Sequence, residues 1–156
     1  MSPELQILGK VAIAMALGGL IGLEREFADK PAGLRTHMLV AGAAALLVGL
    51  ADVMIRRFGA AGELVRSDPT RVIEAVVTAV GFLGAGMIIR RSDTDHVGGL
   101  TTAASVLFAA AVGICVALNE FLLAVGVTAL DLATLRGVKP VETWLRRRRR
   151  APPPRR

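Results

Sequence analysis

The chain has 156 residues, which is the size of one ordinary domain. Hydrophobic residues make up 53% of it and charged residues 21%, and the mean hydropathy is +0.56. One cysteine and two histidines exclude a disulfide scaffold and a zinc site built from a Cys/His cluster. The charges gather in short patches and leave long apolar runs between them, which argues against an ordinary soluble enzyme.

Five apolar runs follow one another, at residues 5–23, 38–55, 72–89, 98–118 and 121–135. A helix needs about 17–25 apolar residues to cross a bilayer, and the runs are too long for barrel strands. Residues 97–119 carry no charge at all, whereas a soluble bundle would need a polar face on each helix. We therefore expect an all-α, multi-pass bundle of about five transmembrane helices at residues 1–135, followed by a basic tail at residues 136–156.

Lysine and arginine counts predict the orientation, because cytoplasmic loops are rich in both. The first loop, the third loop and the tail together carry 14 of them, and the second loop carries four. This places the N-terminus outside and the tail in the cytoplasm. The tail is interpreted as a positive-inside anchor or as a polybasic patch on anionic lipid. It shows no folded module for nucleic acid.

Acidic residues inside the spans are candidate functional groups, because each is costly in lipid. Asp52 precedes Arg56 by four residues, which is also the spacing of a helical ion pair. Glu74 follows Arg71 by three residues near a helix start, where an anion is favoured. Asp131 lies deepest within its run, and it is read either as a functional acid or as a hydrogen-bonded packing residue.

The first loop is dense in charge and is broken by Pro31, Ala32 and Gly33. Glu24 ends the first span and Arg35 precedes the second. These two residues either pair across the loop and fix the angle between the helices, or line a vestibule.

Glycines mark places where helices approach closely. Gly18 and Gly22 form a GxxxG pattern in the first span, and Gly84 and Gly86 lie in the third. The second pair allows either packing or local unwinding, as at transporter sites. The chain shows no nucleophile–base pair, P-loop or dinucleotide fingerprint, so we expect no enzyme and no cofactor.

Four segments in order resemble the membrane domain of the MgtC/SapB family: GGLIGLERE at 18–26, PAGLRTHMLV at 31–40, RVIEAVVTAVGFLGAGMIIR at 71–90 and GLTTAASVLFAAAVGI at 99–114. The positions that recur in the family fall on Glu24, Arg25, Arg35, Thr36, Arg71, Gly84, Gly86, Thr101 and Thr102. The sequence departs from the family pattern at Glu74, Ala79 and Leu107. Many members also carry a soluble C-terminal domain, where this sequence has a basic tail.

The resemblance implies a bacterial inner-membrane protein linked to magnesium homeostasis and adaptation to low Mg²⁺. One member is described as restraining the F-type ATP synthase, which makes a membrane-protein partner one expectation. A homo-oligomer in contact with membrane lipids is another.

Three hypotheses follow, each with a structural signature. A non-enzymatic regulator would leave small-residue grooves such as Gly18/Gly22 open for a partner helix. A Mg²⁺ or proton transporter would bring Glu24, Asp52, Glu74 or Asp131 together in one wet cavity. A purely structural oligomer would depend on the glycines and on none of the acids. The sequence leaves any metal-binding residues unknown.

Overall fold

The computed structural model describes residues 2–58, 68, 70–91 and 96–149. Its helices are α1 (Pro3–Phe27), α2 (Leu34–Phe58), α3 (Thr70–Met87), α4 (Leu100–Ala117) and α5 (Phe121–Arg149). Each has the length and the apolar composition needed to cross a membrane. The predicted all-α, five-span architecture is therefore confirmed.

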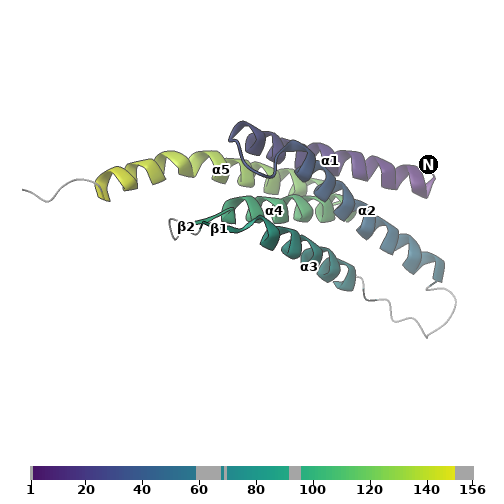
Figure 1. The fold of residues 1–156 in the computed structure, drawn as a ribbon. Coiled ribbons are helices and arrows are strands. Elements are labelled where there is room, and N and C mark those ends of the chain that lie inside the picture. Colours follow the sequence, from purple (N-terminus) through teal and green to yellow (C-terminus); the bar gives the residue numbers. More distant parts are fainter. Residues whose placement is uncertain (1, 59–67, 69, 92–95, 150–156) are drawn as a thin grey trace, which may run out of the picture.

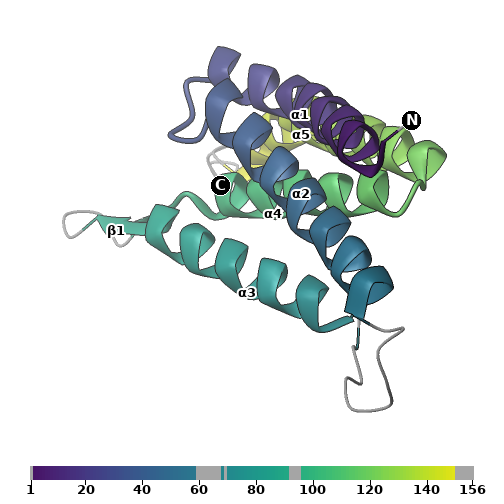
Figure 2. The same ribbon diagram turned by 90° about the vertical axis from the view of Figure 1, so that its right-hand side faces the viewer.

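The helices form a bundle around α2 and α4 (Figure 1). α1 packs along α2, while α5 packs on α1 and α4. Figure 2 shows α3 on the far side of α4 from α1. Five alternating passes give the bundle two ends, which we call the N-terminal end (Ser2 and the α4–α5 turn) and the hairpin end (the α1–α2 loop and the β-strands).

Close backbone approach at glycines holds α1, α2 and α4 together. A Cβ atom on Gly18 would lie 2.6 Å from the Ala41 Cβ atom, and one on Gly22 would lie 2.8 Å from the Gly33 carbonyl oxygen. A side chain on Gly113 would overlap the backbone at Ala41. The Gly18/Gly22 groove is thus filled by α2, and the expectation that it stays open for a partner helix is wrong.

The glycines of α3 behave differently from those of α1. α3 is helical through Met87, so its backbone is not unwound at Gly84 or Gly86. Gly84 is buried, and a Cβ atom there would make ordinary contact with Ala103 at 3.4 Å. A Cβ atom on Gly86 would have no neighbour within 4 Å. Packing therefore explains Gly84, and the structure gives no packing reason for Gly86.

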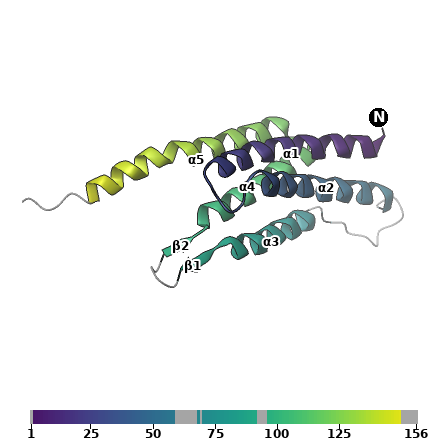
Figure 3. The same ribbon diagram turned by 45° about the horizontal axis from the view of Figure 1, so that its top comes forward.

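Two short strands at the hairpin end were not expected from the sequence. β1 (Ile89–Arg91) and β2 (His96–Gly98) pair antiparallel, with Arg90 opposite Val97 (Figure 3). They carry the chain from α3 into α4. Gly99, with φ at +89°, precedes the start of α4 at Leu100.

The turn between α4 and α5 consists of residues 118–120. Asn119 has φ at +66° and lies in the turn that separates α4 from α5. α5 then runs without interruption through the expected boundary near residue 135 to Arg149. The last part of the predicted tail, residues 150–156, lies outside the described residues.

Candidate functional site

Seven polar or charged side chains are buried in the described part of the chain, all on transmembrane helices. They are Glu24, Arg25, His37, Thr102, Ser105, Thr128 and Asp131. All but Thr128 are linked by contacts or by charge, and we call those six the buried polar cluster. Because an ionisable group inside a membrane is costly, such a cluster is a functional candidate by default.

Arg25 and Glu24 form a buried ion pair near the end of α1. Their side chains are 2% and 4% exposed. The Arg25 Nε atom donates a hydrogen bond to Glu24 Oε2 at 2.5 Å. The Nη2 atom also contacts Glu24 Oε2, but it lacks hydrogen-bond geometry and finds no other acceptor among the described residues. Arg25 therefore keeps hydrogen-bonding capacity inside the bundle.

Asp131 brings a second carboxylate to this pair from α5. It is 6% exposed, and it lies close enough to Arg25 and Glu24 to interact with both charges. Its Oδ2 atom is buried and has no hydrogen-bond partner in the described part of the chain. Opposite charges on α1 and α5 thus face a shared interior that holds an unsatisfied donor on Arg25 and an unsatisfied acceptor on Asp131.

His37 extends the cluster into α2 and α4. Its Nδ1 atom donates to the Gly33 carbonyl oxygen at 2.9 Å, and its Nε2 atom lies 3.1 Å from Ser105 Oγ. In a neutral imidazole Nε2 then accepts the hydroxyl hydrogen of Ser105. Ser105 Oγ also lies 2.9 Å from the Thr102 carbonyl oxygen. The single hydroxyl hydrogen of Ser105 cannot bond to both acceptors at once. Its position therefore depends on whether the Nε2 atom of His37 carries a proton.

The α1–α2 loop fixes this arrangement from the hairpin end. The Glu26 carboxylate at the end of α1 accepts the backbone N–H of Leu34 at 3.0 Å and so caps α2. Gly33 leaves room for that carboxylate, because a Cβ atom there would overlap it. The ion pair given by the structure for Glu24 is with Arg25, while Arg35 is exposed. Glu26 therefore links the end of α1 to the start of α2.

A family model described as "MgtC family" matches residues 11–144. The chain belongs to the MgtC family. It is 37% identical over 145 residues to Protein SrpB of Synechococcus elongatus, covering 88% of this chain and 78% of that protein. It is 35% identical over 130 residues to the Putative magnesium transporter YhiD of Escherichia coli K12, covering 81% of this chain and 57% of that protein.

Protein MgtC of Brucella abortus is 44% identical over 104 residues, which are 67% of this chain and 39% of that relative. The chain thus spans little more than half of YhiD and less than half of the Brucella protein. No solved structure matches the chain. The name of YhiD describes that protein as a putative magnesium transporter.

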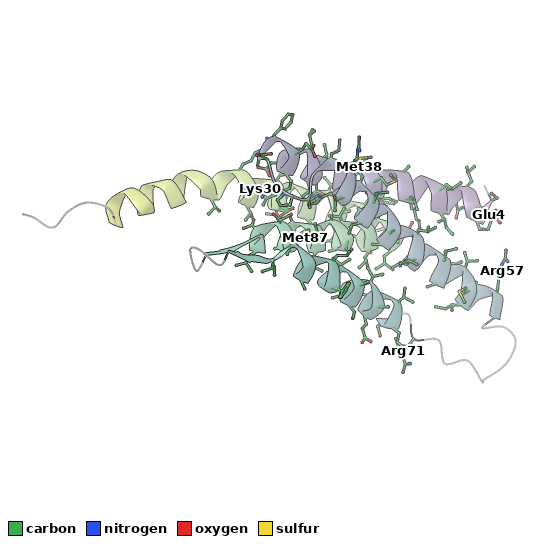
Figure 4. All side chains as sticks on the ribbon, viewed as in Figure 1. Glu4, Lys30, Met38, Arg57, Arg71 and Met87 are labelled. Carbon is green, nitrogen blue, oxygen red and sulfur yellow. The ribbon has the colours of Figure 1, made fainter. Side chains whose placement is uncertain are left out.

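The positions that recur in the MgtC family do not all gather in one place. Glu24, Arg25 and Thr102 belong to the buried polar cluster. Arg35 and Thr101 are exposed at the hairpin end, and Thr36, Gly84 and Gly86 lie outside the cluster. Arg71 is exposed at the other end of the bundle, as Figure 4 shows.

The four acids separate into two groups. Glu24 and Asp131 come together, whereas Asp52 and Glu74 are exposed near the N-terminal end. Asp52 forms the expected ion pair with Arg56, at 3.0 Å. Among the described residues no ion pair joins Glu74 to Arg71. The expectation that the intramembrane acids converge therefore holds for one pair of the four.

Sequence reasoning missed His37 and Ser105 as members of the cluster. A histidine that directly precedes an apolar run is a usable signal, because its ring nitrogens need partners when buried. Ser105 gives no such signal among its alanine neighbours. In the described residues no three His, Cys, Asp or Glu side chains gather in a way that could hold a metal ion.

Proposed function

We propose that this protein supports magnesium homeostasis and adaptation to low Mg²⁺ as a non-enzymatic regulator that acts through a membrane partner. Its site of action is the bacterial inner membrane, with the N-terminus outside and the tail in the cytoplasm. The observation that carries the proposal is the buried polar cluster, in which Arg25 pairs with Glu24 of α1 and interacts with the charge of Asp131 on α5.

The central arginine favours regulation over a Mg²⁺ route. Magnesium binds carboxylate oxygens and retains several water molecules. A guanidinium group is always charged, so it repels a divalent cation from the same space. The two acids that meet in the bundle are thus already neutralised in part by Arg25. Such a cluster is suited to a switch between helix arrangements, since buried ion pairs depend strongly on geometry.

A partner would meet the bundle through its membrane-facing surface. Phe82 on α3 is 81% exposed and Leu122 on α5 is 89% exposed, and both would otherwise face lipid. Candidates for the partner are the F-type ATP synthase, which the family resemblance suggests, and a second copy of this chain.

A second candidate function is proton or cation transport through the intramembrane carboxylates. The convergence of Glu24 and Asp131 favours it, together with the unsatisfied Arg25 Nη2 and Asp131 Oδ2 atoms. A proton is the cation best suited to this interior, because it needs no coordination shell.

One experiment separates the two functions. The chain and its Arg25→Gln, Asp131→Asn and Asp52→Asn variants are expressed in a bacterium that lacks its own family member, and growth is measured at low Mg²⁺. The same purified proteins are reconstituted into liposomes containing Mg²⁺-sensitive and pH-sensitive dyes. Asp52→Asn is the matched control, because Asp52 is exposed and far from the cluster.

The regulator proposal predicts growth that depends on Arg25 and Asp131, no ion flux above that of empty liposomes, and changed ATP hydrolysis in inverted membrane vesicles. Flux that disappears in Asp131→Asn but not in Asp52→Asn would instead establish the transporter. Orientation is tested by labelling single cysteines at Ser2 and Lys30 in a Cys115→Ala background with a membrane-impermeant reagent. Labelling of Lys30→Cys from the outside would refute the proposed topology.

A further inference from the structure

A cavity of about 800 Å³ opens at the N-terminal end, away from the buried polar cluster. Figure 1 shows that the start of α1 and the end of α2 diverge there. Its apolar walls include Ile7, Ile13, Val48, Ile55, Val72 and Phe121. Cavities of roughly 300–1,000 Å³ with apolar walls and a few polar groups are typical ligand sites.

Lys10 places a positive charge in the lining of this cavity. Its Nζ atom donates to the carbonyl oxygen of Ala117, the last residue of α4, at 2.8 Å. The ammonium group therefore lies level with the C-terminal end of α4, about 10 Å along α1 from the start of that helix. An ammonium group carries three N–H donors, so two remain for another acceptor.

The other polar residues that line the cavity do not neutralise the charge of Lys10. Asp52 and Arg56 also line the cavity, but they form an ion pair with each other at 3.0 Å. Gln6 and Asn119 add neutral polar groups. The lining thus has a net charge of +1 beside apolar walls, which matches a molecule with one anionic group and an apolar body.

We propose that this cavity binds an anionic phospholipid from the leaflet at the N-terminal end. The lipid phosphate contacts the Lys10 ammonium and the exposed side of the Arg56 guanidinium. Its acyl chains follow the apolar wall formed by Ile13 and Val48. This site is independent of the proposed regulatory function and lies at the opposite end of the bundle from the basic tail.

The test is native mass spectrometry of the purified full chain in detergent, titrated with phosphatidylglycerol or phosphatidylcholine. We expect phosphatidylglycerol to bind more tightly, and Lys10→Gln to weaken it by about fivefold, the factor that one charge supplies at a lipid surface. Lys30→Gln, an exposed lysine at the hairpin end, is the matched control and should change binding by less than about twofold. Ala51→Phe should weaken the binding of both lipids, because the larger side chain fills part of the cavity.

Equal binding of the two lipids, or phosphatidylglycerol binding that is unchanged in Lys10→Gln, would overturn the proposal. Addition of inorganic phosphate alone tests whether the cavity binds a free anion instead of a lipid headgroup. If it raises the thermal stability as much as the lipid does, the cavity is a site for a free anion and the proposal is wrong. Should Lys10→Gln fail to fold, Arg56→Gln replaces it, because Arg56 is 76% exposed and its loss leaves the bundle intact.

Discussion

Replacing Arg25 by glutamine tests whether the buried polar cluster holds the bundle together. Arg25, Glu24 and Asp131 are 2%, 4% and 6% exposed, so the variant leaves two carboxylates in the interior without their cation. Removing one partner of a buried ion pair typically costs about 3–5 kcal/mol. We expect a loss near the lower limit, about 3 kcal/mol, because interactions between membrane helices average only about 0.6 kcal/mol each.

The triple variant Glu24→Gln, Arg25→Gln, Asp131→Asn tests whether the lost stability comes from unpaired charge. It removes all three charges, and replacing a whole buried charge group is often close to neutral. We therefore expect it to recover all but about 1 kcal/mol of the stability lost in Arg25→Gln. The control is Arg56→Gln, which breaks the exposed pair with Asp52 and should cost at most about 0.5 kcal/mol.

The assay is unfolding of each protein in mixed micelles with increasing dodecyl sulfate, followed by circular dichroism at 222 nm. If Arg25→Gln costs no more stability than Arg56→Gln, the buried polar cluster does not hold the bundle together. If the triple variant is less stable than the single one, the loss reflects packing rather than unpaired charge.

Three further substitutions test individual contacts, each by the same unfolding assay. Gly18→Ala should cost about 1–3 kcal/mol because its methyl group meets α2, whereas Gly81→Ala, with nothing within 4 Å, should stabilise α3 by up to about 1 kcal/mol. Equal effects would contradict the close approach of α1 and α2. Ser105→Ala removes the partner of the His37 Nε2 atom and should cost about 1–3 kcal/mol, and a neutral result would show that water satisfies the ring. Gly33→Ala should displace the carboxylate that caps α2 and cost about 1 kcal/mol, with faster hydrogen exchange in the first turn of α2; unchanged exchange would mean that the cap survives.

The fold was largely predictable because lipid imposes simple requirements on a sequence. A span must be long, apolar and hydrogen-bonded within itself, so charge-free runs such as residues 98–118 identify helices directly. The same reasoning could not find the strands at residues 89–91 and 96–98. They are short, contain charged residues and lie outside the hydrocarbon, where no such requirement applies.

The candidate site was predictable only in part. Asp131 stands out because acids inside apolar runs are rare, and Glu24 stands out because it directly follows the first run. What one sequence cannot give is the direction in which each side chain points around its helix. Arg25 and Arg35 flank the same loop, yet one is buried and the other exposed. His37 and Ser105 become visible only when α2 and α4 are placed side by side.

The adjacency of Glu24 and Arg25 also bears on how the protein is made. These two residues leave the ribosome together, about a hundred residues ahead of Asp131. While α1 enters the bilayer, its opposite charges can neutralise each other, so the helix does not have to carry a lone ion into lipid. Asp131 arrives only with α5 and meets a guanidinium group that is already in place. Insertion of α5 therefore brings a second carboxylate to an ion pair that is already formed, and the three charged groups meet only once α5 packs on α1.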